Sequence, residues 1–274
     1  SQIDLIKKGD FPDWMLKAIV NDMKVQRMKG LETADGLATT LYGAYINERT
    51  WQQELDEINE YEKISKADIV KFANDFFKDN YVVVYKEKGV NDKLVRVQNP
   101  GITPIKINRE AQSPFLKSIL STKAGDIKPQ FIDYNTAIAV SKIKDKKVSF
   151  VKNKYNEVAQ VSYVFPFGTD NDKELSLGVS VLQYLGTDKY TPEQLKEEFF
   201  KLGISNSFRT SNDQTIITLT GLESNMKKGV ELMNHWLTHV KADKAIYDQT
   251  VKTILESRDV AKKDKTRIMT ALTN

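Results

Sequence analysis

The sequence predicts an α+β fold in which layers of helices pack on antiparallel sheets. Three observations support this fold class: helical spacing of apolar residues dominates residues 1–80, short β-rich runs follow residue 136, and helices come after each pair of such runs. Strand pairs that alternate with helices favour an α+β sandwich over a doubly wound parallel sheet. At about 150 residues per domain, the chain length of 274 residues predicts two folding units.

The first region is expected to be a succession of helices. Asp13 is placed to cap the first helix, which carries Trp14, Ala18, Val25 and Met28 near helical spacing. The helices are expected over residues 13–28, 33–47, 51–61 and 65–77.

The last of these helices begins with a capping box, in which Ser65 accepts a backbone hydrogen bond and Asp68 lies near the positive end of the helix dipole. It is expected to bury Ile69, Phe72, Ala73 and Phe76. After it, Tyr81–Lys86 is β-branched and aromatic, which predicts a buried strand.

A change of composition marks the boundary between the two regions. Four of the seven prolines (Pro100, Pro104, Pro114 and Pro129) lie between residues 99 and 130. Ile102, Ile105 and Ile107 are expected to tether this stretch to a surface. We therefore divide the chain into a first domain (1–90), a connector (91–135) and a second domain (136–274).

The second region begins with strands and continues with alternating helices and strands. The runs 147–152 and 157–166 are expected to form an antiparallel hairpin across the turn between them. Thr191-Pro192-Glu193-Gln194 has the pattern of a helix start, with a capping threonine, proline at the first position and glutamine closing the box. Strands are expected at 137–143, 147–152, 157–166, 205–210 and 215–221, and helices at 173–185, 191–202, 224–240 and 244–262.

Composition excludes several classes of site. The chain has no cysteine, which rules out thiol nucleophiles, disulfides and thiolate zinc sites but does not choose a cellular compartment. Its net charge is only +4, and Asp145 interrupts the densest group of lysines at 142–147, so nucleic-acid binding is not expected. Apolar runs have the length of strands, so we expect no membrane span.

The two histidines, His235 and His239, have the i, i+4 spacing of a metal pair on one helix. On a helical projection, however, they lie opposite an apolar stripe (Met226, Val230, Met233, Leu237 and Val240) that is expected to face the core. Neither H-E-x-x-H nor H-x-x-E-H is present, so we expect both histidines to face solvent without a metal.

No other chemical motif is convincing. G-x-S-x-G and the glycine-rich phosphate loops are missing. The acidic groups Glu54/Asp56/Glu57 and Glu197-Glu198 lie on amphipathic helices and are expected to be solvated, and Glu256 and Asp259 are unremarkable alone. From the residues alone, we predict no catalytic, cofactor-binding or metal-binding residue in this chain.

An ordered set of segments nevertheless resembles the pitrilysin/insulinase family of zinc peptidases. Gly168–Asn171, the leucine-rich helix after it, Phe200–Gly203 and Ser207–Thr210 look like the start of one homologous half. Other segments look like the end of the preceding half, namely Gly9–Phe11, Lys29–Glu32, Ile64–Ile69 and Asn80–Val84. The resemblance implies two partial peptidase-type domains joined by the connector.

The family's H-x-x-E-H motif, with a distant glutamate, implies zinc and a general base. The corresponding positions here are Ser180, Gln183 and Tyr184, and Glu256 lies near the region of the distant ligand. Serine, glutamine and tyrosine do not supply a normal zinc site or a basic carboxylate. The resemblance therefore implies that zinc belongs to an upstream half.

The resulting hypothesis is a non-catalytic internal portion of a zinc metalloendopeptidase, which forms chamber wall and hinge and encloses a peptide with the upstream half. The alternative is a catalytically inactive scaffold, assembly or peptide-binding subunit with the same fold. A third interpretation, a helical peptide-binding module, predicts almost no sheet.

Overall fold

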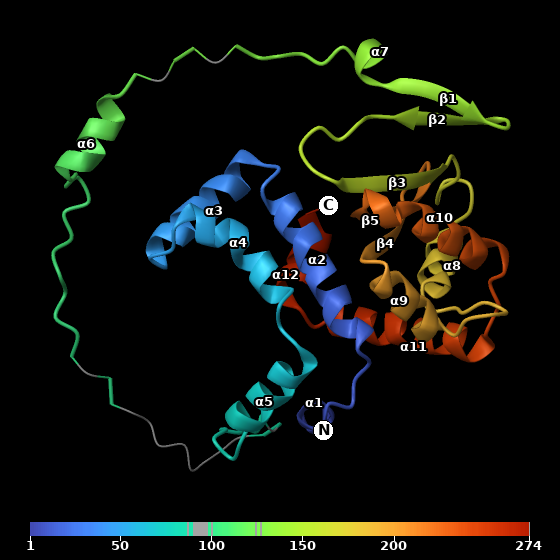
Figure 1. The fold of residues 1–274 in the computed structure, drawn as a ribbon, viewed down its shortest axis with the longest axis horizontal. Helices are drawn as coiled ribbons and strands as arrows, with labels where there is room; N and C mark the ends of the chain where they lie inside the picture. The colour runs from blue at the N-terminus through green and yellow to red at the C-terminus, as the bar shows by residue number, and fades with distance from the viewer. Residues whose placement is uncertain (87, 90–97, 100, 124, 127, 274) are drawn as a thin grey trace. The chain divides into compact units, whose positions relative to one another are not determined.

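The computed structural model describes residues 1–86, 88–89, 98–99, 101–123, 125–126 and 128–273 (Figure 1). The chain forms two compact units. One unit combines Ser1–Asp79 with Asn153–Asn274, and the other is Asn80–Lys152. The fold class is α+β as predicted, with helices against antiparallel sheets, and the sheets exclude the all-helical module.

The N-terminal helices confirm the predicted succession. They are α1 (Gln2–Lys8), α2 (Trp14–Gly30), α3 (Ala34–Ile46), α4 (Trp51–Tyr61) and α5 (Lys66–Phe76). The box at the start of α5 forms as expected: Asp68 N donates to Ser65 Oγ at 3.2 Å, and Ser65 N donates to Asp68 Oδ2 at 2.9 Å. The prediction for Asp13 is wrong, because its carboxylate makes no cap hydrogen bond and instead accepts from Lys66 Nζ at 2.9 Å.

Two predictions of burial near α5 are also wrong. Ala73 is buried, but Phe72 and Phe76 are more than half exposed and stack on each other at 5.2 Å between ring centroids. Tyr81–Lys86 is not a strand, and its apolar side chains are exposed. A strand needs a neighbour for its backbone hydrogen bonds, and this run pairs with no strand among the described residues.

Residues 80–152 contain short elements. They are α6 (Pro114–Ser121), α7 (Tyr134–Ala137), β1 (Ala139–Ile143) and β2 (Lys146–Phe150). The predicted hairpin between 147–152 and 157–166 is wrong, because β2 pairs with β1 across a two-residue turn in which Lys144 has φ +56°. The tethering isoleucines Ile102, Ile105 and Ile107 are also exposed, each by 75% or more.

The central sheet of the first unit has the order β3-β5-β4, all antiparallel. Its strands are β3 (Val158–Phe165), β4 (Ile204–Thr210) and β5 (Thr215–Leu222). Alternate residues of β5 are buried, so one face of the sheet meets the core. The other face carries polar side chains, among them Ser162 and Thr218, whose hydroxyl oxygens lie 3.1 Å apart.

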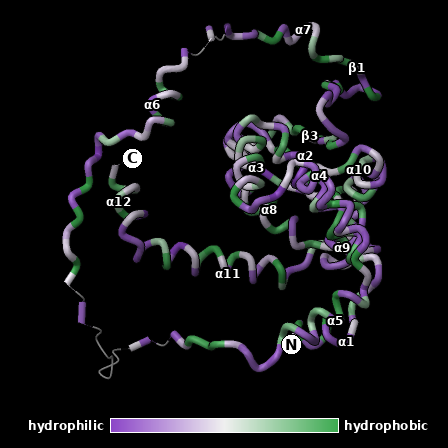
Figure 2. Tube along the Cα trace, turned by 60° about the vertical axis from the view of Figure 1, so that its left-hand side comes forward, coloured by the Kyte–Doolittle hydropathy of each residue, from purple (hydrophilic) through white to green (hydrophobic). Residues whose placement is uncertain are grey.

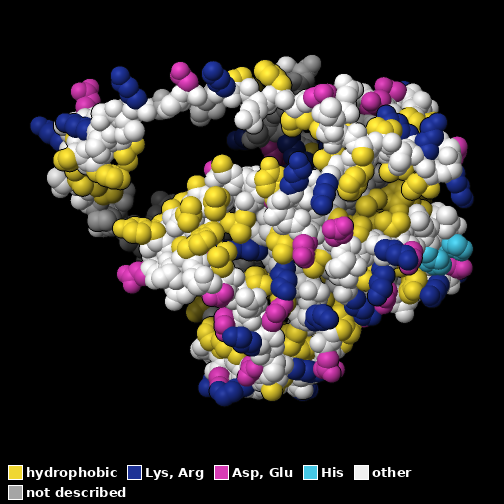
Figure 3. Space-filling view, turned by 45° about the horizontal axis from the view of Figure 1, so that its top comes forward, with side chains coloured by type: hydrophobic (Ala, Val, Ile, Leu, Met, Phe, Trp, Pro, Cys, Tyr) yellow, Lys and Arg dark blue, Asp and Glu magenta, His cyan; other side chains and the backbone are white. Residues whose placement is uncertain are grey.

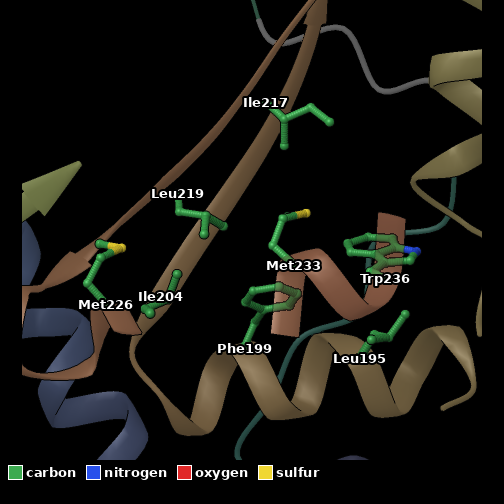
Figure 4. Packing of buried hydrophobic residues seen from close by; sticks show 8 residues of the cluster. All are labelled: Leu195, Phe199, Ile204, Ile217, Leu219, Met226, Met233 and Trp236. Carbon is green, nitrogen blue, oxygen red and sulfur yellow. The ribbon is translucent and has the colours of Figure 1, made fainter. Parts of the chain in front are cut away.

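The core lies between the buried face of this sheet and two helices. These are α9 (Pro192–Lys201) and α10 (Glu223–Thr238), preceded by α8 (Leu175–Leu182) and followed by α11 (Lys244–Ala261) and α12 (Lys265–Thr273). Figure 4 shows side chains of α9 and α10 converging beneath β5. The cluster consists of Leu195, Phe199, Ile204, Ile217, Leu219, Met226, Met233 and Trp236.

Part of the predicted apolar stripe on α10 is confirmed. Met226 and Met233 are buried, whereas Val240 lies beyond the helix end and is 40% exposed. Trp236, which the projection did not place in the core, is 3% exposed and donates its indole N–H to Leu185 O at 3.0 Å.

Beyond the core, apolar and polar residues alternate along α11 (Figure 2). No side chain of α11 or α12 is buried. Across the described part of the chain, we find no helix that is both long and apolar enough to cross a membrane.

Candidate functional site

The position of α8 is set by a tight loop before it. Thr169 N donates to Ser211 O at 3.0 Å, and Asp170 N donates to Asn212 O at 2.9 Å, so the loop lies directly on the turn between β4 and β5. A side chain at Gly168 would collide with the Asn212 carbonyl group, and glycine is therefore required by this close approach.

A groove lies between α8 and α9 on one side and α11 on the other. Its volume is about 830 Å³, which is within the range of pockets that hold ligands. Its lining combines apolar side chains with hydroxyl and amide groups. The lining residues are Ser180, Tyr184, Pro192, Glu193, Lys196, Ala245, Ile246, Gln249, Thr250, Thr253 and Ile254.

The polar side chains at the end of α8 bond to their own helix. Ser180 Oγ donates to Ser176 O at 2.8 Å, and Gln183 Nε2 donates to Val179 O at 3.5 Å. Tyr184, just beyond the helix, is half exposed, and the Lys196 ammonium group lies 5.5 Å from its ring centre. This end of the groove therefore offers an aromatic face and a cation.

Glu256 is not among the residues that line this groove. It is exposed on α11, 3.9 Å from Lys252, and Asp259 is likewise exposed, 3.2 Å from Lys262. Ser180 and Tyr184 therefore line the groove, whereas Glu256 and Asp259 do not.

The predicted solvent exposure of the histidines is confirmed for His239 and wrong for His235. Figure 3 shows the two side chains together at the surface, but His235 is only about a quarter exposed because it lies against the loop after α8. Its Nε2 is 3.1 Å from Thr187 Oγ1 and 3.5 Å from Asp188 Oδ1. The two imidazole rings stack at 4.6 Å between centroids.

Thr187 connects His235 to the loop after α8. The hydroxyl oxygen of Thr187 accepts from the backbone N–H groups of Lys189 and Tyr190, at 3.2 and 3.0 Å. The contact between His235 Nε2 and Thr187 Oγ1 therefore ties the helix to this loop, so a structural role explains His235.

The expectation of a solvated carboxylate is wrong for Glu54, which is 7% exposed. Its side chain accepts from Arg27 Nη2 at 3.0 Å and forms an ion pair with Arg49, whose Nε lies 2.9 Å from the carboxylate. Arg49 also donates to Glu57 at 2.7 Å, and this hydrogen bond holds the pKa of Glu57 below its usual value. The spacing of charged residues along α4 did not predict this cluster of ion pairs, because both of its arginines lie outside α4.

Comparison with known proteins addresses the segment that contains the groove. Residues 147–274 match the model of the family described as Insulinase (Peptidase family M16). This segment is therefore similar to the insulinase family. We refer to residues 147–274 as the insulinase segment. A comparison with curated proteins finds no match.

Among solved structures, the chain is similar to a protease from Helicobacter pylori and to the periplasmic protease PqqL from Escherichia coli. The first similarity has 16% identity and a TM-score of 0.40, and covers 44% of this chain and 30% of that protease. The second similarity has 12% identity and a TM-score of 0.40, and it covers 96% of this chain and 32% of PqqL. The chain thus spans about a third of the length of either protease.

The donor set on the insulinase segment does not fit a zinc ion. Ser180 and Tyr184, which the resemblance aligns with the two histidines of the zinc motif, line the groove, and the α11 residues across it are uncharged. Zinc in proteins is bound by thiolate, imidazole and carboxylate groups, and among the residues that line the groove Glu193 alone carries such a group. Within the described ranges, no group of three or more histidine, aspartate or glutamate side chains is arranged to hold a metal.

Proposed function

We propose that this chain is a non-catalytic internal portion of a zinc metalloendopeptidase. Two observations together support the proposal. The insulinase segment contains the helix α8, but this helix and the residues just after it carry Ser180, Gln183 and Tyr184 where the resemblance would require metal ligands and a general base. In this proposal, zinc and the water-activating carboxylate are supplied by an upstream half of the parent protein.

The groove beside α8 then serves as part of the wall of a substrate chamber. Tyr184 and Ile254 offer apolar surface, and the amide and hydroxyl groups of Gln249 and Thr253 can exchange hydrogen bonds with a peptide backbone. Such groups bind extended peptides without demanding one side-chain sequence. The substrate class proposed is therefore an unfolded peptide enclosed with the upstream half.

The connector supplies the second part of the proposal. Two halves that open for substrate need a covalent link long enough to remain intact during the motion. Residues 91–135 have that length, and we propose that they link the halves at the hinge.

The first test is to measure zinc content and peptide hydrolysis with the purified chain. We expect zinc far below one ion per chain after dialysis and no cleavage of an unfolded peptide, with an authentic zinc peptidase as positive control. One bound zinc per chain together with chelator-sensitive cleavage would refute the proposal.

The second test addresses the chamber wall. Fluorescence anisotropy of a labelled unfolded peptide is expected to show binding that weakens severalfold in Tyr184→Ala. Lys252→Ala provides the matched control, because Lys252 lies on α11 but not in the groove lining. Equal affinities for all three proteins would contradict a role of the groove in peptide contact.

The same residues at α8 also suit an inactive scaffold or peptide-binding subunit. The coding sequence upstream of residue 1 separates the two functions. A helix there with H-x-x-E-H, followed by a distant glutamate, supports the peptidase, and an upstream half without these residues supports the inactive protein.

A further inference from the structure

Helix α2 lies outside the insulinase segment but carries a stripe of residues directed at it. We define the α2 stripe as Trp14, Ala18, Asn21, Val25 and Met28, whose spacing of three or four residues places them on one side of the helix. Ala18 and Val25 are 1% and 4% exposed. The other side of α2 contacts α4 and the residue that follows it, because Arg27 pairs with Glu54 and Lys24 pairs with Glu62.

At its start, the stripe contacts the end of α9. The Trp14 ring meets Phe200 edge to face, with centroids 6.2 Å apart and an interplanar angle of 75°. The Lys201 ammonium group lies 4.9 Å from the Trp14 ring. An edge-to-face pair and a cation–π contact each favour one orientation, so this end of the helix is fixed in direction as well as buried.

The middle of the stripe approaches the backbone that joins α9 to β4. Gly203 there has φ +61°, and a Cβ at this position would lie 3.2 Å from Asn21 Cβ. Glycine therefore allows both the left-handed turn and the close approach of α2.

The end of the stripe contacts the residues that lead into β3. Asn156 Nδ2 lies 2.8 Å from Glu32 Oε1 and 3.4 Å from Met28 O, and donates to both. The stripe thus meets the insulinase segment at its start, middle and end.

We propose that the α2 stripe is a permanent joint that holds residues 1–79 to residues 153–274 independently of the covalent connector. The partner of the stripe is the surface made by the end of α9, Gly203 and Asn156. The inference rests on these contacts, and not on the proposed function.

The experiment separates the covalent link from the joint. A recognition sequence for a specific protease is inserted after Ala111, an exposed residue outside the helices of the connector. After complete cleavage under native conditions, we expect the two fragments to elute together in size-exclusion chromatography and to give a one-to-one complex in native mass spectrometry. Separation of the wild-type fragments would overturn the proposal.

A pair of substitutions tests whether the stripe is the contact that holds them. Ala18→Glu places a charge at a buried position of the stripe, and Lys17→Glu places the same charge on its exposed neighbour. We expect the cleaved Ala18→Glu protein to separate into two peaks and the cleaved Lys17→Glu protein to stay together.

Circular dichroism of uncut Ala18→Glu identifies a variant that has lost its helices. In that case Asn21→Arg, which acts at the Gly203 contact, replaces it in the assay. Fragments that remain together with a folded Ala18→Glu or Asn21→Arg chain would contradict the assignment of the joint to this stripe.

Discussion

The central sheet and residues 80–152 are both rich in β-branched and aromatic residues, but among the residues that the structure describes in these two regions only those of the sheet contribute to a core. Leu219 and Met233 have no exposed surface, whereas Val82 and Phe131 are more than 90% exposed. In the sheet, β5 has a strand on each side and α10 against one face. The hairpin of β1 and β2 has no third strand within the described residues. Apolar sequence thus produces a core only where a second layer covers it.

The largest expected effect tests this contrast directly. Leu219→Ala removes a fully buried side chain beneath α10 and is expected to lower the free energy of unfolding by about 3–4 kcal/mol. Val84→Ala, in an exposed run, is expected to change it by less than about 0.5 kcal/mol. Urea unfolding followed by circular dichroism measures both, and similar losses would show that residues 80–152 have a core of their own.

A smaller effect is expected at the buried carboxylate of α4. Glu54→Gln leaves Arg27 and Arg49 without their shared partner, at a cost of about 1–2 kcal/mol, because both arginines remain partly hydrated. Glu60→Gln removes an exposed pair with Lys63 and is expected to cost less than about 0.5 kcal/mol. Equal unfolding free energies for the two variants would deny the cluster a stabilising role.

The loss of folding stability at acidic pH is expected to depend in part on Glu57. The hydrogen bond from Arg49 lowers its pKa in the folded chain, so its contribution to stability is present above the usual value of 4.5. This contribution is lost as the pH falls from 4.5 through the lowered folded pKa. Thermal unfolding from pH 6 to pH 3 is therefore expected to show a shallower loss of Tm in Glu57→Gln, and an unchanged slope would disprove the linkage.

The smallest effect is expected in the hairpin. Lys144 has φ +56°, a left-handed conformation that asparagine tolerates better than lysine does. Lys144→Asn is expected to slow amide exchange in β1 and β2 without changing the global unfolding free energy. A global gain would mean that the hairpin is coupled to the core.

Local patterns in the sequence predicted local structure well. The capping boxes at Ser65 and Thr191 form as expected, since both partners lie within three residues. The fold class and the strands β3, β4 and β5 were also predictable, because alternation and turn residues are local signals.

The predictions that failed concern residues and strands whose partner in the folded chain is not specified by local sequence. Tyr81–Lys86 has the composition of a strand but no neighbour, and β2 pairs with the preceding strand instead of the following one. The burial of Glu54 depends on Arg27, and that of His235 depends on Thr187. At the candidate site, the family resemblance singled out Ser180 and Tyr184, but the groove also needs α11, whose position no local pattern specifies.

The joint between α2 and α9 also has a consequence for synthesis of the chain on the ribosome. Trp14 is made long before Phe200, and at about 5–20 residues per second the interval is roughly 10–40 s. During that time Ala18 and Val25 have no α9 to cover them. The nascent helix therefore exposes an apolar stripe of the kind that chaperones bind, and its final burial waits for translation of the insulinase segment.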